Sequence, residues 1–392
     1  ADLDAGTARP LLENAMNPTL SASGHLVFFR GRSELSQDAY FTDGALWAVP
    51  FDPGRLTIQG QPVPVENGVR GSNSGAGQYS IADDGTLAYV AGTGEEPRRR
   101  LLWVERDGVA TPALDEPGSY RDPRISPDGD RLAVNLLGDV WLADVARRNP
   151  NRLTFGKIAG RPIWGPGGRT VTFGQFSDEG YNVFEVPAGG GEPVALSRGF
   201  TVLVPAAWDP EGRVLVCRYL DRSDGDWDVV LLDRESDAEP RPLLDSPYRE
   251  LHPTLSPGGD ALAYTSDETG TVEVYIQDFP RLGNKVKVSN GGGTEPLWTR
   301  GGAELVYRTD SHLMAVAVTA DPVTGERRVG EPRPLFDDRY LKGELGQTAN
   351  YDVAADGERF LMIELEDPGK QEIVVVLDWF TELERLAPTS ER

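Results

Sequence analysis

Short stretches of alternating apolar and polar residues recur along the whole chain, separated by residues that favour tight turns. One pattern appears eight times: an apolar residue, a short turn that ends in glycine, and a second apolar stretch. The eight turn glycines are Gly24, Gly85, Gly129, Gly168, Gly212, Gly259, Gly302 and Gly357. The residues four positions before them are all apolar, namely Leu20, Ile81, Ile125, Trp164, Trp208, Leu255, Trp298 and Val353. The pattern predicts strand–turn–strand hairpins in which the glycine adopts a positive φ.

Each predicted hairpin is followed by further strand-like segments. A third alternating stretch follows, as in Val140–Asp144 and Val274–Asp278, and a shorter fourth one ends near Arg152–Thr154. Four strands in each repeat, with turn glycines spaced by about the length of one blade, are typical of β-propellers. We therefore expect an all-β fold: an eight-bladed β-propeller of four-stranded antiparallel blades, with seven blades as the alternative.

The two ends of the chain predict how the ring closes. The last repeat supplies three strands, ending with Glu372–Asp378, and lacks a fourth. The N-terminal stretch Arg9–Leu12 matches the fourth strand at Arg241–Leu244, so we expect it to pair with the last blade and remove two open sheet edges. We expect a single propeller domain over residues 1–380, followed by a short helix and tail over residues 381–392.

Composition agrees with a turn-rich globular domain. Of 392 residues, 45 are Gly and 30 are Pro, and 39% are hydrophobic. The formal net charge of −23 repels phosphate backbones and anionic lipid, so nucleic acid and membrane-surface binding are disfavoured. No apolar stretch approaches the length of a membrane span, so we expect no direct membrane insertion by this chain, and we expect a monomer. Because the chain begins at Ala1 and not at Met, we expect a mature product or an excised domain.

Several motifs resemble the TolB-like, WD40-like propeller repeats of bacteria. They are Leu46–Asp52, Gly60–Val65, Gly291–Trp298, Tyr351–Met362 and Val376–Phe380. The resemblance is greatest to the C-terminal propeller of bacterial receptor-type serine/threonine protein kinases. It implies an extracytoplasmic location, periplasmic or at the cell surface, and a sensor or scaffold role. The motifs of the kinase domain itself do not occur in the sequence.

Two local motifs could carry chemistry, and each has a simpler interpretation. Gly71–Gly75 has the letters of a hydrolase nucleophile elbow, but that motif requires a following helix, whereas a propeller strand follows here. Asp221–Asp228 contains four carboxylates that could bind calcium, although a hairpin connection is naturally rich in Asp and Gly. The only cysteine, Cys217, lies in an apolar stretch and is expected to be a buried small side chain.

The repeats themselves predict a site. Residues seven positions before the turn glycines precede the innermost strands, and in a propeller they would meet around the channel mouth. The polar ones, which we take as the candidate ligand-binding set, are Asn17, Gln78, Asp122, Arg161, His252, Glu295 and Asn350. Polar groups converging in a concave site can orient a ligand, although residues at a rim are often polar only because water covers them. Arg161 is the preferred anchor, because its planar fork suits a carboxylate. A loop from the insertion Arg327–Gln347 could also fill this mouth.

Trp164, Trp208 and Trp298 are expected to pack blades together, since Leu and Ile replace them in other repeats. We therefore expect a non-catalytic recognition module that binds a protein, peptide or small molecule at the channel mouth, without a cofactor or a metal. The alternative is a metal-dependent enzyme of the lyase or lactonase type. In that case channel carboxylates and His252 would hold the ion.

Overall fold

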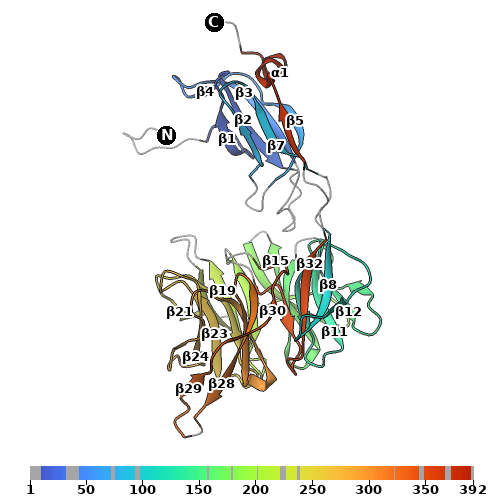
Figure 1. Cartoon of the computed structure of the whole chain (residues 1–392), viewed down its shortest axis with the longest axis vertical. Helices are drawn as coiled ribbons and strands as arrows, with labels where there is room; N and C mark the ends of the chain where they lie inside the picture. The colour runs from blue at the N-terminus through green and yellow to red at the C-terminus, as the bar shows by residue number, and fades with distance from the viewer. Residues whose placement is uncertain are drawn as a thin grey trace. The chain divides into compact units, whose positions relative to one another are not determined.

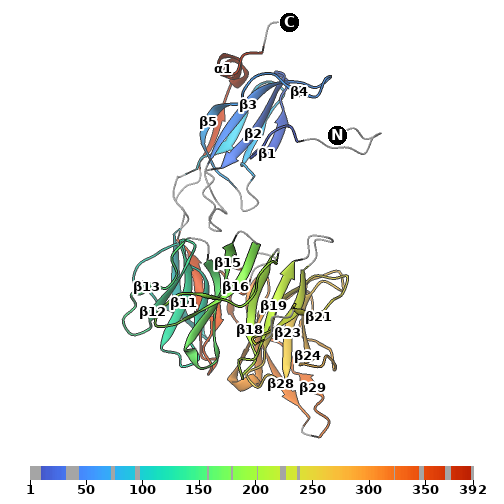
Figure 2. The same ribbon diagram turned by 180° about the vertical axis from the view of Figure 1, so that it is seen from behind.

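The computed structural model describes residues 10–31, 44–71, 76–92, 98–156, 159–177, 180–200, 202–220, 227–235, 239–321, 323–343, 348–366 and 372–389. The chain divides into two compact units instead of the single domain expected from the sequence. Arg98–Glu366 form one, here called the ring unit, and Ala1–Pro97 with Asp367–Arg392 form the other, the terminal unit. Figures 1 and 2 show the strands of both units from opposite sides.

The ring unit contains consecutive antiparallel sheets in which the strands follow chain order. The first three are β10 (Arg121–Ile125), β11 (Arg131–Leu136), β12 (Asp139–Asp144) and β13 (Pro150–Arg152); β14 (Ala159–Trp164), β15 (Thr170–Ser177), β16 (Gly180–Pro187) and β17 (Val194–Ala195); and β18 (Leu203–Trp208), β19 (Val214–Leu220), β20 (Trp227–Asp233) and β21 (Arg241–Leu244). The next two are β22 (Glu250–Leu255), β23 (Ala261–Ser266), β24 (Glu273–Asp278) and β25 (Val286–Lys287); and β26 (Thr294–Thr299), β27 (Glu304–Arg308), β28 (His312–Ala320), β29 (Arg327–Val329) and β30 (Arg333–Asp337). Short 3-10 turns, η2 (Pro166–Gly168) and η3 (Arg300–Gly302), form the hairpin turn in two of these sheets.

Strands from both ends of the ring unit complete its sixth sheet. β31 (Asp352–Val353) and β32 (Arg359–Leu365) come from the C-terminal end, and β8 (Arg99–Glu105) and β9 (Ala110–Pro112) come from the N-terminal end. The first strands contact one another in the cyclic order β10, β14, β18, β22, β26, β31 and back to β10. The ring unit is therefore a closed β-propeller of six blades, and neither eight nor seven blades share the ring.

The terminal unit accounts for the remaining repeats. Its sheets are β1 (Met16–Leu20), β2 (His25–Gly31), β3 (Gly44–Asp52), β4 (Thr57–Ile58) and β5 (Val63–Val69), and β6 (Tyr79–Ile81), β7 (Leu87–Val90) and β33 (Ile373–Val376). The helix α1 (Trp379–Leu386) confirms the short C-terminal helix. Trp379 and Leu383 of α1 pack with Phe29, Leu46 and Leu87 in one core, so these repeats share an apolar core of their own.

The predicted pairing of Arg9–Leu12 with Glu372–Asp378 is not observed. Leu11 and Leu12 lie outside any strand, Arg9 lies outside the described residues, and β33 pairs with β7. The ring unit is still closed by strands from its two ends, because β8 and β9 complete the sheet that β31 and β32 begin. Among the described residues, no helix has both the length and the apolar character to cross a bilayer.

The repeated hairpin turn is confirmed in every copy. All eight turn glycines have a positive φ, from 68° at Gly168 and Gly259 to 93° at Gly302. In the first blade, for example, the Gly129 amide donates to the Ser126 carbonyl at 2.8 Å. A β-carbon would strain the backbone at such a φ, and this is why the pattern keeps glycine at this position.

Candidate functional site

The innermost strands of the ring share a bulge that the sequence analysis missed. β10, β14, β22 and β26 each shift register at a residue–proline pair, and the residue before proline has a φ of 47° to 52°. These residues are Asp122, Arg161, His252 and Glu295. Proline cannot donate to the strand ladder, and a bulge re-aims the side chain beside it. The recurring X-Pro pair in the printed sequence was the signal that could have predicted this geometry.

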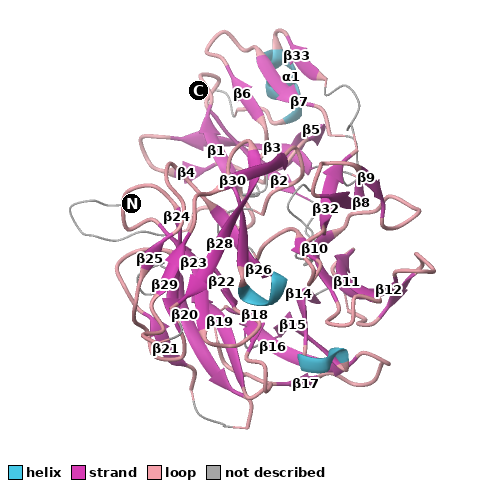
Figure 3. Cartoon of the chain, turned by 60° about the horizontal axis from the view of Figure 1, so that its bottom comes forward, coloured by secondary structure: helices cyan, strands magenta, loops and turns pink. Residues whose placement is uncertain are grey.

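The structure brings only part of the predicted set together. Asp122, Arg161, His252, Glu295 and Asn350 belong to the ring unit, whose inner strands surround its centre in Figure 3. Asn17 and Gln78 belong to the terminal unit, where Asn17 is exposed and its amide donates to the Gly77 carbonyl at 3.4 Å. The seven residues therefore do not form one ring, because the first two repeats fold outside the propeller.

The segments that flank residues 344–347 contact the bulge residues of two inner strands, Asp122 of β10 and Glu295 of β26. Thr348 donates its hydroxyl proton to Asp122 Oδ1 at 2.8 Å, and the Asp122 amide donates to Asn350 Oδ1 at 3.0 Å. Glu295 accepts from the amides of Gly343 at 2.9 Å and Asn350 at 2.7 Å. Asp122, Glu295 and Asn350 thus bind groups of the chain itself, namely Gly343, Thr348 and each other's backbone or side chains.

Arg308, on the strand β27 that pairs with the Glu295 strand, holds the residues before this segment, Asp338, Tyr340 and Leu341. Its side chain is fully buried and lies 2.6 and 2.8 Å from the two oxygens of Asp338, with Glu295 Oε2 at 3.5 Å. It also donates to the carbonyls of Tyr340 and Leu341 at 2.9 and 3.0 Å. Burial alone would lower the pKa of Arg308, but the charges of Glu295 and Asp338 outweigh it and raise that pKa.

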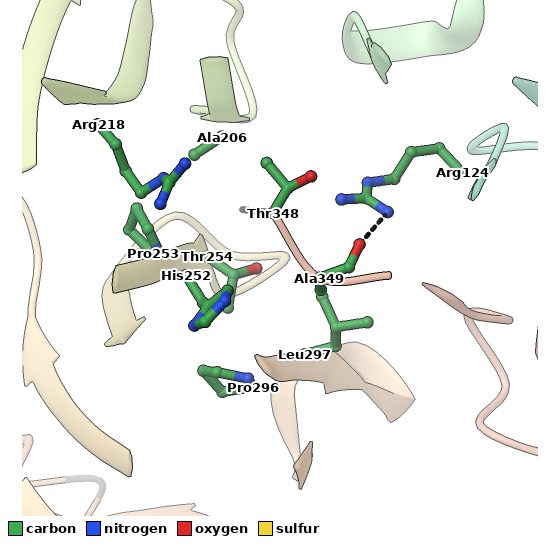
Figure 4. A pocket seen from close by; sticks show the side chains of 10 residues that line it. All are labelled: Arg124, Ala206, Arg218, His252, Pro253, Thr254, Pro296, Leu297, Thr348 and Ala349. Atoms are coloured by element: carbon green, nitrogen blue, oxygen red, sulfur yellow. Dashed lines mark hydrogen bonds between the residues drawn. The ribbon is translucent and has the colours of Figure 1, made fainter. Parts of the chain in front are cut away.

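A small cavity of about 40 Å³ lies beside this segment, between inner strands of different blades (Figure 4). Its lining residues are Arg124, Ala206, Arg218, His252, Pro253, Thr254, Pro296, Leu297, Thr348 and Ala349. In the close-up the guanidinium groups of Arg124 and Arg218 point inward from opposite sides, with Thr348 between them. None of the ten lining residues is acidic. Arg124, Ala206, Thr254 and Leu297 are only half-buried, as expected where a cavity communicates with solvent.

Arg218 and Arg124 are fixed in different ways. Arg218 is fully buried, and its guanidinium carbon lies 4.5 Å from the centre of the Trp227 ring. Arg124 Nη1 donates to the Ala349 carbonyl at 2.9 Å. Burial, followed by the like charge of Arg161, lowers the pKa of Arg218 to about 9, while Asp122 opposes that shift. Arg161 itself is half-buried over the Tyr181 ring and does not line the cavity.

His252 is the one predicted site residue that lines this cavity. Its Nδ1 lies 3.2 Å from Thr265 Oγ1 and 3.4 Å from Thr294 Oγ1. Its Nε2 is buried and has no hydrogen-bond partner among the described residues. Burial, together with the charges of Arg218 and Arg124, lowers the pKa of His252 to about 3, so the ring is neutral near pH 7.

The other candidates have structural roles or lie outside the described residues. Trp208 and Trp298 are buried in blade cores, and the Trp164 indole donates to the Arg124 carbonyl of the preceding blade at 3.2 Å, which confirms the packing role. Cys217 is buried as expected, and burial raises the pKa of its thiol. Most of the Gly71–Gly75 and Asp221–Asp228 motifs falls outside the described residues. Among the residues that the structure describes, no three His, Cys, Asp or Glu side chains are grouped as metal ligands.

Comparisons with known proteins identify the fold. No protein-family model matches the chain, and no curated protein matches it. The structure is similar to that of a putative TolB from Agrobacterium tumefaciens, with a TM-score of 0.57 and 18% identity over 70% of this chain and 100% of that chain. TolB from Acinetobacter baumannii gives a TM-score of 0.47 and 13% identity over 91% and 84% of the two chains. An oligogalacturonate lyase from Vibrio parahaemolyticus gives a TM-score of 0.44 and 14% identity over 72% of this chain and 84% of that chain. The fold is that of a TolB-like β-propeller.

Proposed function

We propose that the protein is a non-catalytic recognition module that binds a peptide or small-molecule group in the channel of its six-bladed ring. The observation that supports this most is the cavity lined by Arg124, Arg218 and His252, the last of which has no hydrogen-bond partner at Nε2 among the described residues. Preformed concave sites with a few convergent polar groups are typical of ligand binding.

The character of the lining groups favours binding over chemistry. Guanidinium groups stay charged near neutral pH and hold ligands without exchanging protons. The pKa of about 3 keeps His252 neutral and distant from the pKa range suited to general acid–base work. The alternative metal enzyme would place a cation against Arg124 and Arg218, where their positive charges oppose it.

A peptide selection tests the proposal. Random peptides selected on the full chain should bind the wild-type protein in calorimetry and lose binding to Ala206→Leu, which fills the cavity. Val194→Leu is the control, because Val194 is 63% exposed on an outer strand, and the same peptides should bind it normally. Selected peptides that bind Ala206→Leu as well as wild type would contradict a channel site.

We also propose an extracytoplasmic location, periplasmic or at the cell surface, as in the kinase-associated propellers that the repeats resemble. Fractionation of the producing cells with immunodetection of the chain tests this proposal. Detection in the cytoplasmic fraction alone would contradict it.

A further inference from the structure

The strand β33 of the terminal unit is paired on one side only. In every other sheet the third strand is paired on both edges, as β20 is with β19 and β21. β33 occupies the third position of its sheet and pairs with β7, beside which Figure 3 shows it, and no second strand among the described residues pairs with it. An unpaired strand edge is a place where another extended segment can add to a sheet.

The register shows which backbone groups of β33 lie at this open edge. The Ala91 amide donates to the carbonyl of Glu372, the residue directly before β33, at 2.9 Å. In an antiparallel ladder, alternate residues direct both of their backbone groups to the same neighbour. Every second residue after Glu372 therefore faces β7, whereas the backbone amides and carbonyls of Ile373 and Val375 face the open edge.

Exposed apolar side chains accompany the open edge. Ile373, Val375 and Leu377 are 71%, 55% and 71% exposed. They occupy alternate positions and therefore lie on one face of the sheet. Val376, on the other face, packs against the core of the terminal unit. Contiguous apolar groups on a surface are typical of interaction sites.

The ring unit contains a strand of nearly the same sequence that is covered. Val229–Asp233 of β20 have the sequence Val-Val-Leu-Leu-Asp, and Val374–Asp378 have the sequence Val-Val-Val-Leu-Asp. Val230 and Leu232, the counterparts of two of the exposed residues, are only 4% and 3% exposed. They are buried because β21 extends the sheet and side chains of the neighbouring blade pack against them. β33 therefore has the sequence of a covered third strand but no fourth strand beside it among the described residues.

The fourth strand β21 indicates the chemistry of a fitting partner. Its sequence is Arg-Pro-Leu-Leu, and Arg241 Nε lies 3.9 Å from Asp233 Oδ2 at the end of β20. β33 is flanked by two exposed acidic residues, Glu372 and Asp378, of which Asp378 is the counterpart of Asp233. Two copies of β33 paired antiparallel would place these like charges opposite each other, which is unfavourable. A segment that carries basic residues is complementary instead.

We propose that the open edge of β33 is a docking site for an extended, basic and apolar segment of another protein, which adds to the sheet as an antiparallel fourth strand. This site is additional to the channel site proposed above, because it belongs to the terminal unit. The partner's backbone pairs with Ile373 and Val375, and its basic residues lie beside Glu372 and Asp378. Pairing of the main chains supplies affinity, and the flanking charges favour one type of partner.

A labelled peptide with the sequence Lys-Arg-Pro-Leu-Leu-Val-Lys is the probe for the full chain. Fluorescence anisotropy should show saturable binding, and hydrogen exchange should slow at the amides of Ile373 and Val375. The matched control is the same peptide with both leucines N-methylated. It keeps the charge but loses a backbone donor in either register, so it should bind at least about tenfold more weakly. Equal binding of the two peptides, or no protection at β33, would overturn the proposal.

Variants of one residue separate backbone pairing from side-chain contact. Val375→Pro removes an amide that faces the open edge and leaves the ladder with β7, so it should weaken peptide binding at least about tenfold. Val375→Thr is the matched control, because it keeps the amide and a branched side chain, and it should bind nearly as the wild type does. If Val375→Pro does not fold, the double variant Glu372→Gln, Asp378→Asn takes its place and should weaken binding severalfold at low salt. Unchanged binding in the folded variant would overturn the assignment.

Two further measurements separate this site from the alternatives. Sedimentation of the chain alone should show a monomer, and a dimer that Val375→Pro dissociates would overturn the proposal in favour of a second copy as the partner. Ala206→Leu, which fills the cavity of the ring unit, should bind the probe as the wild type does. Loss of binding in Ala206→Leu would assign the probe to the channel and overturn a separate site on β33.

Discussion

Arg308 and Arg218 occupy the same position of the repeat in two blades of one ring, but their surroundings differ. Arg308 lies beneath Glu295 and is held by Asp338 and two carbonyls, and the pKa of its side chain is raised. Arg218 lies beside Pro205 and faces a cavity, and the pKa of its side chain is lowered to about 9. The Arg308 site therefore holds a loop of the chain in place, whereas Arg218 places a buried positive charge at the wall of the cavity.

The comparison shows that equivalent positions of a repeat can have different surroundings. Buried charges persist when they are paired and hydrogen-bonded. In the Arg308 blade the bulge residue Glu295 and the loop residue Asp338 supply the pairing. In the Arg218 blade the bulge position is a proline, and the Arg218 guanidinium lies over the Trp227 ring at the wall of the cavity.

The largest effect on the free energy of unfolding is expected from removing the ion pair between Arg308 and Asp338. Asp338→Asn removes the charge that faces Arg308 at 2.6 Å and should lower the free energy of unfolding by about 3 kcal/mol, because it leaves a buried charge partly uncompensated. Chemical denaturation measures the change. Asp337→Asn is the neighbouring control, since the Asp337 side chain is 94% exposed, and it should change stability little. Equal effects of the two substitutions would contradict a stabilising role for the Arg308 cluster.

A smaller difference is expected between the two arginines. Arg308→Met leaves Glu295 and Asp338 buried without their cation, whereas Arg218→Met removes a charge whose largest electrostatic neighbour is the like-charged Arg161. We expect Arg308→Met to destabilise the protein by about 2 kcal/mol more than Arg218→Met does. Matched denaturation curves of the two variants measure this difference. A greater loss for Arg218→Met would show that its surroundings also serve mainly to stabilise the fold.

Near neutral pH the smallest effect comes from His252, because its contribution to stability changes only below about pH 6.5. Its pKa is lowered from 6.5 to about 3 on folding, so between these values the unfolded chain binds more protons. Stability should therefore fall as the pH drops from about 6.5 towards 3, by at most about 1.4 kcal/mol per pH unit from this group. Parallel denaturation of wild type and His252→Gln should show a difference that grows only in this acid range. Curves that stay parallel throughout would mean that His252 is not buried as a neutral ring.

The sequence predicts the repeats well and their assembly less well. The hairpins, the turn glycines and the inter-blade packing of Trp164 follow from local patterns, because each pattern determines its own local structure. The number of blades does not follow from local patterns. It depends on Trp379 and Leu383, which pack with the first two repeats in the separate core of the terminal unit. Local pattern cannot tell which repeats share a ring.

The site was predicted only in part for a similar reason. His252 could be located from its place before the innermost strand, but Arg218 lies on the second strand, whose repeated pattern is apolar and does not point to a site. A charged residue in the middle of the apolar stretch Val214–Leu220 was the available signal. The loop contacts of Asp122 and Glu295 involve residues 226 and 48 positions away along the chain, and no local pattern predicts them.

A crystal structure of the full chain with one of the selected peptides tests most directly the central claim that the channel of the ring holds the recognition site. The account predicts a peptide group in the cavity lined by Arg124, Arg218 and His252. A peptide bound only at the outer strands of the blades would contradict the account.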